Sequence, residues 1–155
     1  MPNVETKTGK PELIVKELSE FIGTELALSP DNICELDVDG RVIILRYRPD
    51  DDDWLCFGLV TDDDEPPSRE ILEKALSLSL FGAGTHGLHL GLFGNSLVLS
   101  ESIPADGLTA EILAEKLLFL SRQIAAVTEK IKEEPSVGDV DGFDSSPFNS
   151  NFMQV

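Results

Sequence analysis

The chain has 155 residues, of which 41% are apolar, and this is enough for one compact domain with a hydrophobic core. Its 29 acidic and 12 basic residues give a formal charge of −17, which repels the phosphates of nucleic acids and of anionic membranes. The same charge favours partners that are basic or that must be kept soluble, although many small cytoplasmic proteins are simply acidic.

The cysteines and the lengths of the apolar runs indicate the cellular compartment of the protein. Cys34 and Cys56 each lie in an apolar run, which predicts buried free thiols rather than a disulfide scaffold or a zinc site. The first residues contain no apolar segment typical of a secretory signal. The longest apolar runs, such as residues 54–60, are far shorter than the ~18–20 residues that span a bilayer. We therefore expect a cytoplasmic protein without membrane insertion.

The first element is predicted to be a helix that begins at Pro11. Residues 1–9 are polar, and we expect them to be flexible. A proline suits the first turn of a helix because its missing N–H has no partner there. Apolar residues then recur at helical spacing until Gly23, where the helix should end. This apolar stripe consists of Ile14, Leu18, Phe21 and Ile22, widened by Leu13 and Val15.

Three strands are expected next. Residues 33–38 alternate acidic with apolar side chains, which predicts a strand with one solvated face. Asp39-Gly40 is a strong signal for a tight hairpin, and it leads into a second strand over 42–48. Residues 54–60 are apolar on both faces and predict a central, covered strand.

The second half begins with a helix capped by Ser68, whose apolar face comprises Ile71, Leu72, Ala75, Leu76 and Leu80. Alternation over 85–92 predicts a fourth strand, and Gly94-Asn95 turns the chain into a fifth strand over 97–103. A long amphipathic helix should start near Thr109 and end before Pro135. Its apolar positions are Leu113, Leu117, Leu120, Ile124, Val127 and Ile131.

The predicted order of elements is α-β-β-β-α-β-β-α within a domain of residues 10–134. No helix separates the strands within each hairpin, so the class is α+β with a twisted antiparallel sheet flanked by helices. Residues 135–155 lack periodicity and basic residues, which predicts an acidic, disordered tail. This tail nevertheless contains three of the eight phenylalanines, and a peptide that docks on a partner or on the chain itself is the alternative.

A glycine-rich segment resembles a nucleotide-binding motif by letter only. Residues 82–87 match Gly-x-Gly-x-x-Gly. The dinucleotide motif follows a strand and opens a helix, whereas this segment follows a helix and opens a strand. We therefore expect no bound cofactor, and we interpret the glycines as a turn that lets another backbone approach closely.

The acidic and histidine patterns do not form a metal site or a catalytic site. Glu35-x-Asp37-x-Asp39-Gly40 begins like a calcium loop, but Arg46 occupies the place of the final bidentate carboxylate. Aspartate runs at 50–53 and 62–64 are expected in solvated loops, with at most incidental divalent binding. His86 and His89 fall on opposite faces of a predicted strand. No nucleophile has an activating neighbour, so we expect no enzyme, no catalytic residue and no metal.

The second half resembles the class I chaperones of type III secretion, the Tir-chaperone (CesT-like) family. The similarity covers about residues 10–132 and is clearest in "ILEKALSLSLF", "GTHGLHLGLFGNSLVLSESIP" and "LTAEILAEKLLFLSRQIAAVTEKI". "ICELDVDGRVIILRY" also fits the family's first strands. Phe81 and Gly82 stand near the place where the family commonly has an asparagine.

The resemblance implies a homodimer in the bacterial cytoplasm. Such a protein binds the N-terminal segment of a secreted effector in extended form and keeps it soluble and export-competent, without ATP. By resemblance, effector would contact Leu13, Leu18, Phe21, Ile33 and Leu36. By resemblance, the dimer interface would contain Leu72, Leu76, Leu80, Leu88 and Leu90. For each residue, the alternative role is ordinary monomer core.

Two other functions fit less well. A regulator with the same fold would sequester another chaperone or a transcriptional regulator, and the identity of the captured partner would distinguish it. A small enzyme or ligand-binding domain would need converging polar groups in a pocket, and the sequence contains no such cluster.

Overall fold

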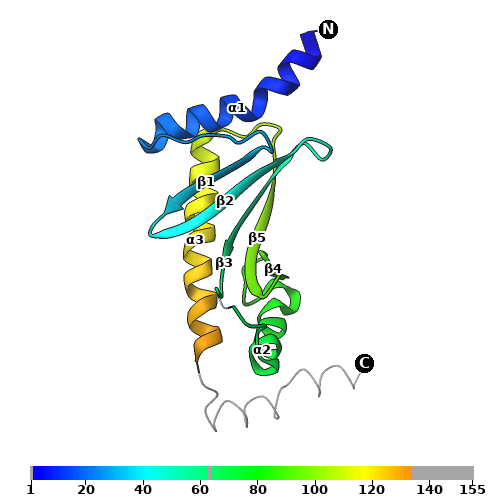
Figure 1. Cartoon of the computed structure of the whole chain (residues 1–155), viewed down its shortest axis with the longest axis vertical. Helices are drawn as coiled ribbons and strands as arrows, with labels where there is room; N and C mark the ends of the chain where they lie inside the picture. The colour runs from blue at the N-terminus through cyan, green and yellow to red at the C-terminus, as the bar shows by residue number, and fades with distance from the viewer. Residues whose placement is uncertain (1, 63, 134–155) are drawn as a thin grey trace.

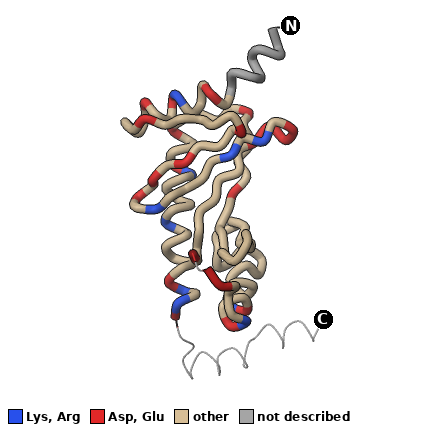
Figure 2. The backbone as a smooth tube through the Cα atoms, viewed as in Figure 1, with Lys and Arg blue, Asp and Glu red and all other residues tan. Residues whose placement is uncertain are grey.

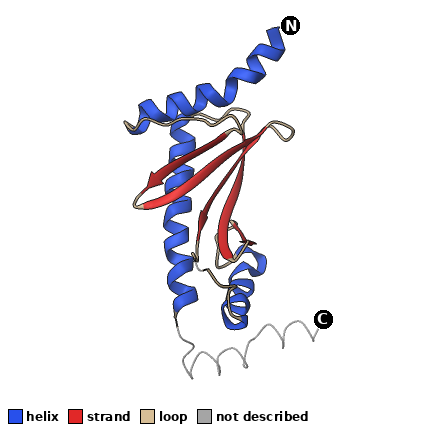
Figure 3. Cartoon of the chain, viewed as in Figure 1, coloured by secondary structure: helices blue, strands red, loops and turns tan. Residues whose placement is uncertain are grey.

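The computed structural model describes residues 2–62 and 64–133, with side chains described from Pro11 onward. Its elements follow the predicted order and form an α+β fold, with a short 3-10 helix after the second α-helix (Figure 3). The predicted disordered tail, residues 135–155, lies outside the described residues. The elements are α1 (Pro2–Ile22), β1 (Ile33–Val38), β2 (Arg41–Arg48), β3 (Asp53–Leu59), α2 (Arg69–Ser79), η1 (Leu80–Gly82), β4 (His89–Phe93), β5 (Ser96–Pro104) and α3 (Ala110–Lys132).

The strands of the described chain form one antiparallel sheet in the order β1-β2-β3-β5-β4 (Figure 1). Strands β1 and β4 are therefore its two edges. Asp39 and Gly40 form the predicted tight turn between β1 and β2, and their φ values of 54° and 82° are those that a type I′ turn requires. Gly94, with φ of 61°, begins the predicted turn between β4 and β5. Both hairpin predictions are confirmed.

Helix α3 lies against one face of the sheet and supplies the central row of the core (Figure 1). Thr109 caps it, with its hydroxyl oxygen accepting a hydrogen bond from Ile112 N at 3.2 Å. Opposite it, the strands contribute buried residues such as Leu45, Trp54 and Leu99. The predicted apolar positions of α3 are all buried: Leu113, Leu117, Leu120, Ile124, Val127 and Ile131.

Helix α1 begins earlier than we expected. It spans Pro2–Ile22, so the structure places residues 2–9, which we predicted to be flexible, in the helix, and Pro11 lies inside it rather than at its start. An internal proline removes one backbone hydrogen bond and bends a helix, but it does not have to end it. Figure 1 shows α1 changing direction along its length, as an internal proline predicts.

Strand β3 is central, as predicted, but only one of its faces is covered. Trp54, Cys56 and Gly58 are buried, whereas Leu55 and Phe57 are half-buried and Leu59 is exposed. The prediction of cover on both faces was wrong because the helices pack on a single side of this sheet. The other face keeps a stripe of apolar side chains in contact with solvent.

Strand β4 is shorter than the alternation over 85–92 predicted. It begins at His89, because the preceding residues form a tight turn. His86 and Gly87 have φ of 53° and 84°, and buried Thr85 donates its hydroxyl hydrogen to Leu88 O at 2.8 Å. His86 therefore lies in a turn, and the expected placement of both histidines on one strand was wrong.

Candidate functional site

Large apolar side chains are exposed on two separate surfaces of the described chain. The first, which we call the α1 surface, consists of Leu13, Phe21 and Ile22 on α1. The second, which we call the α2–β4 surface, consists of Leu76, Leu80, Phe81 and Leu92 on α2, η1 and β4. Phe93 is exposed on the opposite face of β4, where its ring centroid lies 6.5 Å from that of Phe57. The two surfaces lie toward opposite ends of the molecule (Figure 1). Outside them, Val42, Ile112 and Phe119 are exposed, and Leu59 lies on the uncovered face of β3.

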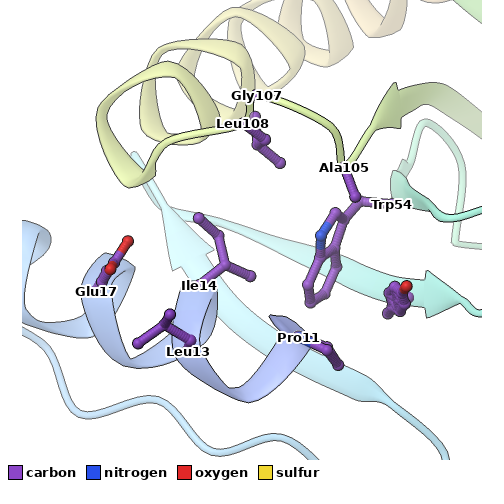
Figure 4. Close-up of a pocket in the computed structure, with 9 residues that line it drawn as sticks. Pro11, Leu13, Ile14, Glu17, Trp54, Ala105, Gly107 and Leu108 are labelled. Atoms are coloured by element: carbon purple, nitrogen blue, oxygen red, sulfur yellow. The ribbon is translucent and has the colours of Figure 1, made fainter. Parts of the chain in front are cut away.

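A cavity of about 290 Å³ lies beside the α1 surface. Figure 4 shows α1, the start of β3 and the loop before α3 arranged around this space. Leu13 and Ile14 line it from the helix, and Trp54 faces them from the sheet. Glu17 stands at its edge. The other lining residues are Pro11, Tyr47, Ala105, Gly107 and Leu108.

Three side-chain hydrogen bonds from the end of β2 hold the aspartates that follow it, beside the wall of this cavity. Tyr47 OH donates to Asp52 Oδ1 at 2.6 Å, and the ring of Tyr47 packs edge-on against Trp54 with centroids 5.4 Å apart. The hydrogen bond to the Asp52 carboxylate, together with burial and nearby negative charge, raises the pKa of Tyr47 to about 12. The guanidinium group of Arg48 donates two hydrogen bonds to the carboxylate of Asp53, at 2.8 and 2.6 Å. The cavity wall is therefore held in place.

The α2–β4 surface differs from the α1 surface because its residues belong to a segment of the sequence without charged side chains. Residues 75–100 contain no Asp, Glu, Lys or Arg, although 26% of the whole chain is charged. Figure 2 shows this uncharged stretch against a backbone where acidic positions are otherwise widespread. Strand β4 is an edge strand, and four of its five residues are exposed. An apolar, uncharged edge is prone to pair with another chain.

The predicted effector-binding residues are divided between the surface and the core. Leu13 and Phe21 are 55% and 58% exposed on the α1 surface. Ile33 is half-buried at the start of β1. Leu18 and Leu36 are buried in the core, so the alternative role as monomer core describes their position.

The predicted dimer residues are divided in the same way. Leu76 and Leu80 are 74% and 55% exposed. Leu72 and Leu90 are half-buried against the core, and Leu88 is buried. Their proposed role in an interface stays a prediction, and only the exposed leucines are available to a partner in this conformation.

Sequence reasoning missed several residues of the two surfaces. Phe81 follows the apolar repeat of the second helix and so is not part of its predicted apolar face, and local patterns do not show that the strand with Leu92 and Phe93 lies at a sheet edge. The absence of charges from residues 75–100 was a signal that could have found all three. Ile22 was assigned to the helix stripe but not to a binding surface.

The two cysteines of the described chain are buried free thiols. Burial raises the pKa of the Cys34 and Cys56 thiols, and the negative charge of Glu101 adds to the effect at Cys56. Both thiols therefore stay protonated and unreactive near neutral pH. In the described part of the chain, no group of His, Cys, Asp and Glu side chains is placed to hold a metal ion.

Among the described helices, none has the length and hydropathy that a membrane crossing requires.

Comparison with solved structures shows the same fold in chaperone complexes. The HopA1–SchA chaperone–effector complex contains a similar chain, with a TM-score of 0.62 at 19% identity over 78% of this chain and 94% of that one. A chain of the ExsC–ExsE complex matches with a TM-score of 0.63 at 20% identity, over 79% of this chain and 93% of that one. A chain in the structure of the Yersinia pestis type III secretion chaperone SycH with a stable fragment of YscM2 matches with a TM-score of 0.57 at 13% identity. This match covers 76% of the present chain and 98% of the other.

The sequence itself was compared with protein families and with curated proteins. No curated protein sequence matches the chain significantly. A family model matches residues 13–128, which include everything from the α1 surface to the last turns of α3. The chain therefore belongs to the Tir chaperone protein (CesT) family.

Proposed function

We propose that this protein is a type III secretion chaperone of the bacterial cytoplasm. It binds the N-terminal segment of a secreted effector in extended form, and it keeps that segment soluble and competent for export without ATP. Membership of the CesT family and a fold shared with chaperone–effector complexes support this proposal. The observation that carries it is the α1 surface, whose exposed Leu13 lines a cavity of about 290 Å³.

The α1 surface suits an extended client segment. Leu13 and Phe21 offer apolar contact, and the adjoining cavity is large enough to receive an apolar side chain of the client. Glu12, Glu17 and Glu20 are exposed on the same helix, so a client segment with basic residues between its apolar ones fits best. Binding of this kind draws on buried apolar area and charge, and it needs no nucleotide.

The second part of the proposal is a homodimer formed through the α2–β4 surface. Two copies that each carry a formal charge of −17 repel one another over most of their surfaces. Residues 75–100 lack Asp, Glu, Lys and Arg, so contact between these segments brings none of their own charges together. Leu76 and Leu80 would be buried in this interface, as would the exposed face of β4.

Co-expression with N-terminal effector segments tests the chaperone proposal. The wild-type chain should keep such a segment soluble and should co-purify with it. Leu13→Asp should reduce the affinity for that segment about tenfold or more, because the contact then loses apolar area and a carboxylate must be desolvated against the apolar side chains of the client. Calorimetric titration with the segment as a synthetic peptide gives the dissociation constant.

Phe119→Asp is the matched control, because Phe119 is 41% exposed on α3, away from the α1 surface. It should bind the peptide like the wild type. Equal loss in both variants would contradict a site on α1. Capture of a second chaperone or a transcriptional regulator, with no affinity for effector segments, would favour the regulatory alternative instead.

A further inference from the structure

Phe81 follows α2 in a backbone conformation that phenylalanine rarely adopts. Its φ and ψ of 55° and 17° lie in the left-handed region, which is unfavourable for a bulky side chain. Its side chain is 86% exposed, more than any other large apolar side chain of the described fold. A strained residue with an exposed aromatic ring indicates a function outside the monomer core.

Glycines hold the loop that carries Phe81 in one shape. Gly84 N donates to Leu78 O at 2.9 Å, and a Cβ on Gly84 would lie only 2.8 Å from the same oxygen. Gly87 N donates to Gly82 O at 3.0 Å, and a Cβ on Gly82 would lie 3.2 Å from Gly87 Cα. The Gly-x-Gly-x-x-Gly pattern therefore builds a tight loop in which backbones approach closely, as the sequence predicted. This loop fixes the position of the aromatic ring.

A cavity of about 350 Å³ opens beside the ring. This volume exceeds the ~150 Å³ that hold a benzene molecule in a protein core. A protruding aromatic ring and a cavity that accepts one thus lie on the same face. A symmetric dimer interface requires such self-complementarity, because the same surface faces itself. The lining residues are Ser79, Phe81, Gly82, Gly87, Leu88, His89 and Leu90.

The charge distribution identifies a second copy of the chain as the occupant. The ring and the cavity both lie within residues 75–100, which contain no Asp, Glu, Lys or Arg in a chain of formal charge −17. A basic client would gain no charge attraction from this segment, whereas a like-charged copy meets no charge of the segment itself there. The exposed edge of β4 adjoins the cavity through His89 and Leu90.

We propose that Phe81 of each copy inserts into the cavity beside η1 and β4 of the other copy. This inference rests on the homodimer of the proposed function and assigns its central contact. The strained backbone at Phe81 holds the ring in its binding position before the two copies meet. The side chain and loop therefore lose little conformational freedom on association.

Phe81→Ala tests the contribution of this ring to the dimer. Two rings leave each dimer, so the dimer dissociation constant should rise about a hundredfold or more in analytical ultracentrifugation. Phe81→Gly should weaken the dimer equally without lowering the Tm of the monomer, because glycine tolerates the left-handed conformation. Phe21→Ala removes a ring that is 58% exposed on α1 and should leave the dimer unchanged.

Photocrosslinking shows where the ring lies. A p-benzoylphenylalanine at position 81, in dimers mixed from light and nitrogen-15 chains, should crosslink to residues 79–90 of the other copy. Crosslinks confined to the same copy, or an unchanged dissociation constant for Phe81→Ala, would overturn the inference and leave the dimer intact. A monomeric wild type would overturn both the inference and the dimer. Capture of an effector segment by that monomer would still support the chaperone proposal.

Discussion

The α1 surface and the α2–β4 surface are both apolar, but their charged neighbours differ. Leu13 and Phe21 lie on a helix with exposed glutamates, and the cavity beside them includes Glu17. Phe81 and Leu92 lie in a stretch of residues without Asp, Glu, Lys or Arg. Apolar area alone therefore does not distinguish the two surfaces. The surrounding charge does, because an acidic rim selects basic partners and repels a second acidic copy.

The two surfaces also differ in how their shape is maintained. The wall of the α1 cavity is fixed by side chains, with Tyr47 bonded to Asp52 and Arg48 bonded to Asp53. The loop of the α2–β4 surface is fixed by backbone hydrogen bonds and by close contacts at glycines. Substitution of single side chains can therefore loosen the first surface more easily than the second.

The largest expected effect is the loss of the dimer in Leu76→Arg. Leu76 is 74% exposed on α2, so the monomer should fold normally. Each dimer would bury two unpaired guanidinium groups at a cost of about 2 kcal/mol or more each. The dissociation constant should therefore rise about a thousandfold, as measured by light scattering over a dilution series.

Leu13→Arg provides the comparison that this prediction needs. Leu13 is 55% exposed on α1, so the same charge enters a surface that we do not assign to the dimer. This variant should remain dimeric. A folded Leu76→Arg protein that stays dimeric, or a Leu13→Arg protein that becomes monomeric, would reverse the assignment of the two surfaces.

The order of elements could be predicted because local patterns determine it. Asp39-Gly40 fixes one hairpin through its backbone preferences, and the apolar repeat of α3 from Leu113 to Ile131 fits only a helix. Ser68 caps its helix as predicted, and Thr109, near which the last helix was expected to start, also proves to be a cap. In both cases a hydroxyl before an apolar repeat satisfies a free backbone N–H.

The site could be predicted only in part because exposure depends on tertiary packing. Leu13 and Leu18 lie on one helix and read alike in the sequence, yet one is 55% exposed and the other fully buried. The difference arises from where α1 meets the rest of the fold, which helical spacing does not encode. Phe81 depends on a left-handed backbone conformation, and no residue-type preference predicts a phenylalanine there.

A moderate effect is expected at the α1 cavity from Tyr47→Phe. This substitution removes the 2.6 Å hydrogen bond to Asp52 and should lower the free energy of unfolding by about 1–2 kcal/mol at neutral pH, as measured by urea titration. The folded-state pKa of about 12 exceeds the ordinary value of 10, so the neutral phenol is the form that stabilises the fold.

The contribution of Tyr47 should therefore be fully present below pH ~10 and should disappear as the pH rises through ~12. Tyr47 is the only tyrosine, so absorbance at 295 nm reports its ionisation directly. A titration midpoint near 10 would show that Asp52 does not hold the phenol. In that case the cavity wall is less rigid than we infer, and the contrast with the glycine loop becomes sharper.

The smallest expected effect is that of deleting residues 135–155. Lys74 of α2 donates a hydrogen bond to Ile131 O at 3.2 Å, so α3 is already tied to α2 before the tail begins. A tail that is disordered contributes little to stability, and the Tm measured by calorimetry should change by about 1 °C or less. A fall of several degrees would instead mean that Phe143, Phe148 and Phe152 pack on the fold. The α2–β4 surface, which is close to the end of α3, would then have an occupant other than a second copy, and the dissociation constant of the truncated dimer would decide between them.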